Sequence, residues 1–288
     1  SRIADKFLEN SVYQRGGAAG RNDVTASYYD RLQALLGAPD SASGLAARLT
    51  NISSSAAQIN LQGSVQALSL FTSNVADSID ALGSLQKDVS NLRADVETEV
   101  GYTIERVNVL LSQIHELNSE VSRLEGLGRS SSGSADLRMT ALQELASLVD
   151  ITVREQPDAR VTIDTASGQV LLDRRLRTLD YPSGAGASQD SYPAIEIRFA
   201  AASSGAGAST GERIESAAVG GKLGGLLDMR DRILPTYSEQ LGVLFTGMAQ
   251  NLNEISNEGT TMPPPNILSG EPNGLIGSDR LGFSGSAI

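Results

Sequence analysis

The chain has 288 residues, a formal net charge of −11 and only 4% aromatic residues. It has no cysteine, which excludes disulfides, thiolate catalysis and cysteine-ligated metal sites. An acidic chain repels nucleic acid and anionic membrane surfaces, so we expect no nucleic acid and no membrane as partner. The sequence contains no apolar run of the length that a membrane-spanning helix needs.

The first 36 residues predict a helix with glycines in its middle. Its interrupted apolar stripe is Ile3, Phe7, Val12, Val24, Tyr28, Leu32, Leu35 and Leu36. A glycine inside a helix costs about 1 kcal/mol relative to alanine. Tertiary packing must therefore hold the helix at Gly16, Gly17 and Gly20, or it breaks there. Pro39 ends this helix, and Asp40 or Ser41 is placed to cap a second one over residues 42–60.

Residues 64–126 predict one very long helix, which either follows the second after a weak break near Gln62-Gly63 or is continuous with it. Its apolar positions recur at steps of three and four, which places them on one helix face. They are Leu82, Leu85, Val89, Leu92, Val96, Val100, Ile104, Val107, Leu111, Ile114, Leu117, Val121 and Leu124. The steps contain a stutter, which favours a bundle helix with nearly straight neighbours. A helix of about 95 Å serves extension, which suggests an architectural protein.

The pattern changes twice in the second half of the chain. Ser134 or Asp136 is placed to cap a helix that runs to Val149. Its inward residues are predicted to be Leu137, Ala141, Leu142, Leu145 and Leu148. From about Asp150 the period changes to two, which predicts strands near residues 151–155, 160–164, 170–172 and 192–199. Residues 182–187 and 200–211 are rich in Ala, Ser and Gly and are interpreted as connectors.

A second long helical run extends from about residue 222 to 257, and Pro235 predicts a bend or restart inside it. The fold class is therefore expected to be mainly α, an elongated bundle of long antiparallel helices with a small inserted β-rich domain. Residues 1–149 and 219–257 would form a discontinuous helical bundle domain, and 150–218 the inserted domain. Residues 258–288 would be an irregular segment rich in proline and glycine.

No catalytic, cofactor-binding or metal site is predicted, and the chain is not expected to be an enzyme. His115 is the only histidine and is interpreted as a surface or groove residue. The glycine-rich stretches lack the Gly-Lys-Ser/Thr ending of a phosphate loop. The paired carboxylates Glu97 with Glu99 and Glu116 with Glu120 are interpreted as parts of a solvated helix face.

Two stretches carry a family resemblance. The first is residues 117–126, followed by Asp136-Leu137-Arg138 and Glu144-Leu145. The second is Gly224-Gly225-Leu226-Leu227-Asp228-Met229-Arg230-Asp231, followed by Leu234-Pro235. Both resemble the flagellar hook-associated protein 1 family, FlgK, the first hook–filament junction protein. The Gly-Gly-Leu-Leu-x-x-Arg-Asp-x-x-Leu-Pro string is the most specific part of the resemblance.

The resemblance implies a structural component of the bacterial flagellum, acting as an extracellular adaptor between hook and filament. It implies as partners neighbouring copies in a ring, the hook protein, the second junction protein and an export chaperone that binds a C-terminal segment. Export would proceed through the type III apparatus without a cleaved signal peptide. The sequence is expected to be a middle fragment without the terminal assembly segments, and monomeric in isolation. The exposed acidic face of the long helix is expected to meet neighbouring subunits.

Other interpretations stay open at this point. The nearer alternative is another axial flagellar protein, either flagellin or the second junction protein. A more distant alternative is a coiled-coil signalling module with a ligand-binding insertion. An enzymatic β domain is the third. The sequences on either side of this segment would separate a signalling protein, which needs a membrane helix, from an axial protein with polar amphipathic ends.

Overall fold

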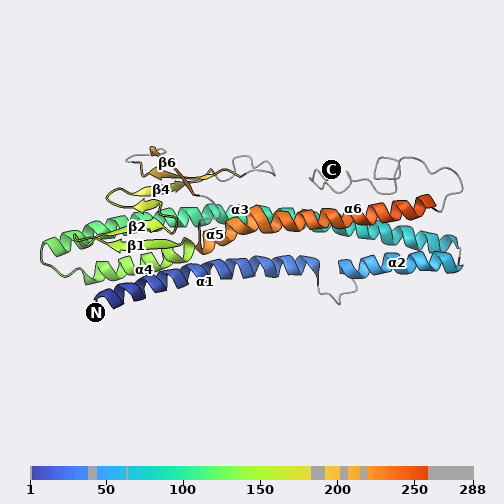
Figure 1. The fold of residues 1–288 in the computed structure, drawn as a ribbon, viewed down its shortest axis with the longest axis horizontal. Coiled ribbons are helices and arrows are strands. Elements are labelled where there is room, and N and C mark those ends of the chain that lie inside the picture. Colours follow the sequence, from blue (N-terminus) through green and yellow to red (C-terminus); the bar gives the residue numbers. More distant parts are fainter. Residues whose placement is uncertain are drawn as a thin grey trace. The chain divides into compact units, whose positions relative to one another are not determined.

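The computed structural model of the chain describes residues 2–37, 44–62, 64–182, 192–201, 207–214 and 219–258. The described helices are α1 (Arg2–Leu36), α2 (Leu45–Gln62), α3 (Val65–Gly126), α4 (Ser132–Leu148), α5 (Gly221–Asp228), the π-helical turn η2 (Met229–Ile233) and α6 (Leu234–Glu258). Two small sheets accompany them (Figure 1). The predicted fold class of a mainly helical bundle with a small β region is confirmed.

The chain forms two compact units. The first joins Ser1–Ser27 to Asp95–Asp231 and contains the described strands. The second joins Tyr28–Ala94 to the segment that begins at Arg232. Helices α1 and α3 contribute residues to both units. The assignment of residues 1–149 and 219–257 to a helical domain, and of 150–218 to an inserted domain, stays a prediction.

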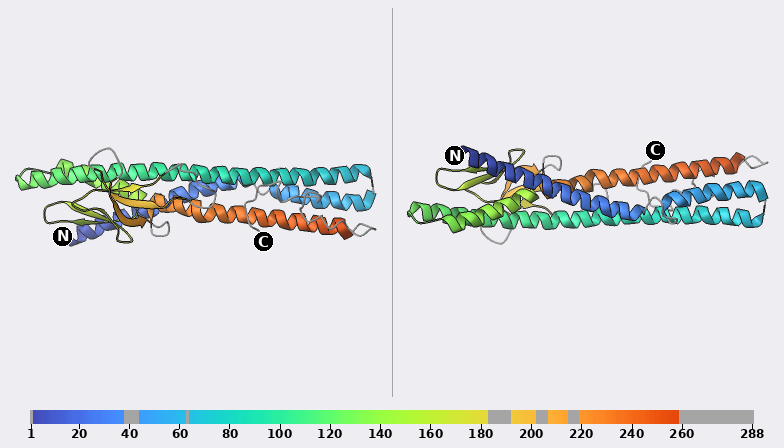
Figure 2. Two further views of the ribbon diagram at one scale, coloured as in Figure 1. Left: turned by 90° about the horizontal axis from the view of Figure 1, so that it is seen from above. Right: turned by 90° about the horizontal axis from the view of Figure 1, so that it is seen from below.

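In the second unit α2 runs antiparallel to the first part of α3. The amide of Asn74 donates to the carbonyl of Asn51 over 3.2 Å, and the guanidinium of Arg48 donates to the carbonyl of Asp77 over 3.4 Å. Arg48, which comes earlier in α2, pairs with Asp77, which comes later in α3, so the two helices are antiparallel. Both views in Figure 2 show them side by side. Of the two alternatives for the junction before α3, the break is confirmed, since α2 ends at Gln62 and α3 begins at Val65.

The apolar stripe of α3 forms the core of each unit in turn. Buried stripe residues are Leu82, Leu85, Val89, Leu92, Val96, Val100, Ile104, Val107, Leu111, Ile114 and Val121. Leu117 and Leu124 are only half-buried. Glycine also caps the C-terminal end of α3: Gly128 adopts φ +66°, and the amide of Arg129 donates to the carbonyl of Leu124. This is the Schellman arrangement, in which glycine tolerates the left-handed conformation.

Helix α1 continues through its glycines because they lie against the end of α4. A Cβ on Gly20 would lie 2.1 Å from the carbonyl oxygen of Ser147, and one on Gly17 would lie 2.0 Å from a carboxylate oxygen of Asp150. Only a residue without a side chain permits this approach. The expectation that tertiary packing must hold the helix at these positions is therefore confirmed.

The strands form two antiparallel sheets, with orders β1-β2-β3 and β4-β5-β6. They are β1 (Ile151–Glu155), β2 (Val161–Thr165), β3 (Val170–Leu172), β4 (Arg177–Asp180), β5 (Ile195–Phe199) and β6 (Ser209–Ile214). Figure 1 shows β1 and β2 beside α4 and the C-terminal part of α3. The sequence patterns identified β1, β2, β3 and β5. They missed β4 and β6, because β4 is mostly polar and β6 is exposed and begins in the small-residue stretch interpreted as a connector.

Two expectations for α4 were wrong. The helix begins at Ser132, so neither Ser134 nor Asp136 caps it; the hydroxyl of the N-cap residue Ser131 instead donates to Glu125. Leu137 is exposed, and its neighbour Arg138 is buried in its place. The inward face of α4 is therefore shifted by one residue at this end, because Arg138 donates hydrogen bonds to the carbonyl of Ala159 and the side-chain oxygen of Asn118.

The helical return confirms the interruption predicted at Pro235. The π-helical turn η2 separates α5 from α6, and Pro235 follows directly in the first turn of α6, where a missing N–H costs little. The expected cap at Asp40 or Ser41 lies outside the described residues. The same holds for residues 183–187 and 202–206 of the predicted connectors and for 259–288 of the predicted irregular segment.

Candidate functional site

A buried polar cluster in the first unit is centred on Arg230 of η2, a residue of the family-like string. Its Nη1 lies 2.9 Å from a carboxylate oxygen of Glu97 on α3 and 2.7 Å from the hydroxyl of Tyr181, which follows β4. Its Nε and Nη2 lie 2.7 and 3.0 Å from the two carboxylate oxygens of Asp231. The guanidinium also stacks 4.2 Å from the ring centroid of Tyr192. The cluster therefore joins α3, η2 and the chain on either side of residues 183–191.

Two members of this cluster, Arg230 and Tyr181, have raised pKa values. Burial opposes the charge of Arg230, but hydrogen bonds to Asp231 and Glu97 raise its pKa above the ordinary arginine value. Burial and the hydrogen bond to Glu97 raise the pKa of Tyr181. The guanidinium thus stays charged and the phenol stays neutral. Such groups are poor proton carriers near pH 7, so the cluster is suited to fastening segments together and not to acid–base chemistry.

The glycines of the same string have a packing role. A Cβ on Gly224 would lie 1.9 Å from the carbonyl oxygen of Val219, and one on Gly225 would lie 2.7 Å from a methyl group of Val24 on α1. Leu226 and Leu227, which follow, are almost fully buried. The glycines of the string therefore allow α5 to approach α1 closely. Arg230, further along the string, then lies within hydrogen-bond distance of Glu97 and Tyr181.

A second polar cluster anchors the β1–β2 hairpin to α3. The side-chain amide of Asn118 donates to the carbonyl of Val161 over 2.8 Å, and its oxygen accepts from the amide of Val161 over 3.0 Å. That oxygen also accepts from Arg138 of α4, whose Nη1 donates to the carbonyl of Ala159 over 2.7 Å. Ala159 has a positive φ of 60°. Arg138 therefore braces the strained hairpin turn, and burial lowers its pKa below the ordinary value.

The second sheet is anchored to α3 in the same way. The amide of Asn108 donates to the carbonyl of Leu179 over 2.8 Å, and its oxygen accepts from the amide of Leu179 over 2.7 Å. A carboxamide carries both N–H donors and an acceptor oxygen, so one asparagine can pair with the carbonyl and the amide of a single strand residue as a neighbouring strand would. One helix thus holds both sheets through two asparagines.

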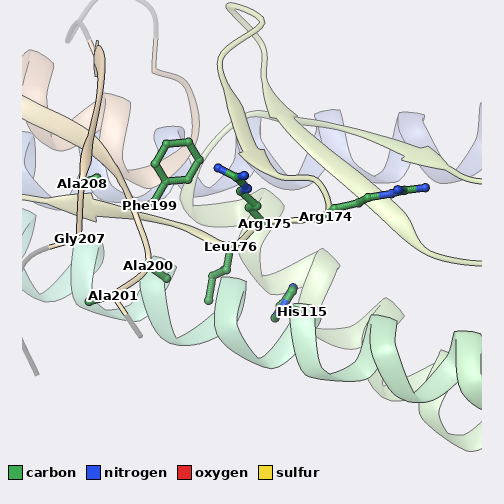
Figure 3. A pocket seen from close by; sticks show the side chains of 9 residues that line it. All are labelled: His115, Arg174, Arg175, Leu176, Phe199, Ala200, Ala201, Gly207 and Ala208. Carbon is green, nitrogen blue, oxygen red and sulfur yellow. The ribbon is translucent and has the colours of Figure 1, made fainter. Parts of the chain in front are cut away.

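The candidates weighed from sequence fall in different places. His115 is half-buried and lines an open pocket with residues of the β3–β4 and β5–β6 connections (Figure 3). Glu116 and Glu120 are exposed, as interpreted. The same interpretation was wrong for Glu97, which pairs with the buried Arg230, and for Glu99, which lies 2.8 Å from Lys222. Their partners lie more than a hundred residues away, so helix periodicity gave no sign of them.

Within the described residue ranges, no group of three or more histidines and acidic residues is placed to hold a metal ion. No described helix combines the length and apolar character that crossing a membrane requires.

Comparison with known proteins supports the family resemblance carried by the string around Arg230. A family model described as the flagellar hook-associated protein FlgK helical domain matches residues 29–267. Flagellar hook-associated protein 1 of Bacillus subtilis (strain 168) is 24% identical over 182 residues, which cover 62% of this chain and 36% of that protein.

A solved structure shares the fold. It is the flagellar hook junction protein FlgK from Burkholderia pseudomallei, with a TM-score of 0.68 and 23% identity over 85% of this chain and 43% of that chain. The chain thus spans less than half the length of either relative. Because the family model matches well over half of the chain, the chain belongs to the FlgK family of flagellar hook-associated proteins.

Proposed function

We propose that this chain is part of a structural protein of the bacterial flagellum, which joins the hook to the filament by protein–protein packing. The observation that carries the proposal is the match of the FlgK helical-domain model to residues 29–267. The names of the two relatives, a hook-associated protein and a hook junction protein, support the same role.

The use of polar residues supports an architectural role. The buried arginines Arg230 and Arg138 and the amides of Asn108 and Asn118 all bind other parts of the chain. Side chains satisfied in this way fix the geometry of the fold and are themselves engaged within the chain. We therefore propose that the protein is not an enzyme and needs no cofactor.

The proposed partners are neighbouring copies in a ring, the hook protein and the second junction protein. An export chaperone would act through a C-terminal segment beyond the part described. The protein would work outside the cell after export without a cleaved signal peptide. The exposed acidic residues of α3, such as Glu116 and Glu120, would lie toward neighbouring subunits.

The proposal is tested in the bacterium that encodes the protein. The gene is deleted and then restored with an epitope-tagged full-length copy, and isolated flagella are examined by immunogold electron microscopy. We expect hooks without filaments in the deletion strain and gold at the hook–filament boundary in the restored strain. Gold along the whole filament would instead favour a flagellin, and gold on the cell membrane would favour a signalling protein.

A further inference from the structure

An open pocket of about 690 Å³ lies in the first unit between α3 and the ends of two sheets. His115 of α3 forms one side, and Arg174, Arg175 and Leu176 of the β3–β4 connection form another. The chain around Phe199, at the end of β5, and Gly207 and Ala208, before β6, complete the lining. Figure 3 shows Arg175 beside the Phe199 ring, with His115 on the helix below.

The charge of this lining is opposite to that of the protein. Among the described lining residues there are two arginines and a histidine but no carboxylate, although the whole chain carries a net charge of −11. The guanidinium of Arg175 lies 5.4 Å from the Phe199 ring centroid. The pocket therefore combines N–H donors with an apolar wall of Leu176 and Phe199.

Arg174 and Arg175 also differ from the other described arginines between β1 and β6. Each of the others forms an ion pair with a carboxylate: Arg154 with Asp164, Arg160 with Asp158, Arg177 with Asp173, Arg198 with Asp180 and Glu196, and Arg213 with Glu196. For Arg174 and Arg175, no carboxylate among the described residues lies within ion-pair distance. Both guanidinium groups are exposed; Arg175 lies beside the Phe199 ring, whereas Arg174 extends away from it (Figure 3), so each is accessible to a carboxylate from outside the chain.

The walls of the pocket are held by the backbone. The amide of Ala200 donates to the carbonyl of Leu176 over 2.9 Å, and the amide of Phe199 donates to the carbonyl of Ala208 over 2.9 Å. The amide of Arg175 donates to a carboxylate oxygen of Asp173 over 2.6 Å, which fixes the turn that carries both arginines. A site built on such supports is preorganised, which lowers the entropic cost of binding.

We propose that this pocket binds an acidic side chain, flanked by an apolar residue, on an extended segment of a partner protein. Small-molecule sites enclose most of their ligand, whereas this pocket is open and suits a side chain that projects from another protein surface. Charge complementarity selects the carboxylate, and the Leu176–Phe199 wall selects the apolar neighbour. The inference rests on the lining alone, so it is independent of the hook–filament assignment.

The test uses the full-length protein and a fluorescein-labelled hexapeptide of alternating glutamate and leucine, with binding followed by fluorescence anisotropy. We expect saturable binding that weakens as salt is raised. A peptide with glutamine in place of glutamate should bind at least tenfold more weakly. The double variant Arg174→Gln/Arg175→Gln should lose at least tenfold in affinity while its circular dichroism spectrum is unchanged, since both side chains are exposed.

The matched control is the double variant Arg129→Gln/Arg213→Gln, which also removes two charges, both at exposed positions outside the pocket lining. It should change the affinity by less than twofold. Equal losses in the control and the pocket double variant would show attraction by net charge alone and would overturn the proposal. Displacement of the peptide by inorganic phosphate at the same concentration would show that the pocket binds any anion, and this result would also overturn the proposal. Self-association that the pocket double variant abolishes would make a second copy the occupant and would also contradict it.

Discussion

Replacing Arg230 by methionine should destabilise the first unit strongly. The arginine is 5% exposed, and its partner Glu97 has a side chain that is 15% exposed. Methionine fills much of the same volume but leaves the carboxylate of Glu97 buried without a cation. Removal of one partner from a buried ion pair costs about 3–5 kcal/mol, because the remaining charge is not compensated.

The rest of the cluster adjusts this figure only slightly. The side chain of Asp231 is 33% exposed and can turn to water when the arginine is gone. The hydroxyl of Tyr181 keeps its hydrogen bond to Glu97. We therefore expect a loss of about 4 kcal/mol, which at about 2 kcal/mol per molar urea lowers the unfolding midpoint by about 2 M. If the two units unfold in separate transitions, the one that contains the sheets should move.

Urea unfolding followed by circular dichroism at pH 7 measures this effect. Arg21→Met is the control, because the 3.4 Å pair of Arg21 with Asp228 is partly exposed and such pairs contribute about 0–1 kcal/mol. The double variant Glu97→Leu/Arg230→Met should recover most of the loss, since an apolar pair of similar size replaces a buried ion pair at little cost. The reasoning is refuted if Arg230→Met costs no more than the control, or if the double variant costs as much as both single changes added together.

Three further results are expected. Gly20→Ala should destabilise the protein by about 2 kcal/mol in thermal unfolding, because the added Cβ would meet the carbonyl oxygen of Ser147. Gly16→Ala should stabilise it by about 0.5–1 kcal/mol, because the nearest atom to the added Cβ, the amide nitrogen of Ser147, lies 3.9 Å away. Asn118→Ala leaves the buried amide and carbonyl of Val161 in β2 without their partner. It should lower the free energy of unfolding by about 3 kcal/mol, and the amides of β2 should exchange their hydrogens faster. Burial opposes the charge of Asp173, but hydrogen bonds from the Arg175 amide and the Arg177 side chain lower its pKa below 3.8. The stabilisation by ionised Asp173 is then present above pH 3.8 and is lost as the pH falls through the lower pKa of the folded state. Arg177→Gln should therefore reduce the loss of stability on acidification, measured as the free energy of unfolding against pH.

Local periodicity predicted the elements that are long or alternate cleanly. The three- and four-residue steps of α3 and the alternation of β5 follow directly from which face is buried. The missed strands β4 and β6 lack that signal. Strand β4 is mostly polar and buries only Leu179; its backbone pairs with β5 and with Asn108, and backbone pairing of this kind leaves no periodic pattern of side chains.

The polar clusters were beyond prediction for a related reason. Glu97 and Arg230 lie 133 positions apart in sequence, and nothing in either helical pattern marks one as the partner of the other. Arg138 shows the same limit at short range, since periodicity favoured Leu137 for the inward position of α4. The acceptors that it meets, the carbonyl of Ala159 in the hairpin turn and the side-chain oxygen of Asn118, explain why the arginine is buried instead.

The roles of these residues bear on how binding surfaces of the protein should be mapped. The Gly-Gly-Leu-Leu-x-x-Arg-Asp string identifies the family, yet Leu226 and Arg230 are buried and bind the chain itself. A substitution there changes stability first, and any loss of assembly that follows says nothing about which surface meets a partner. Charge reversal at exposed positions such as Glu116 and Glu120 leaves the core intact. A defect in assembly at those positions, with an unchanged unfolding midpoint, therefore locates an interface in a way that changes in the family string cannot.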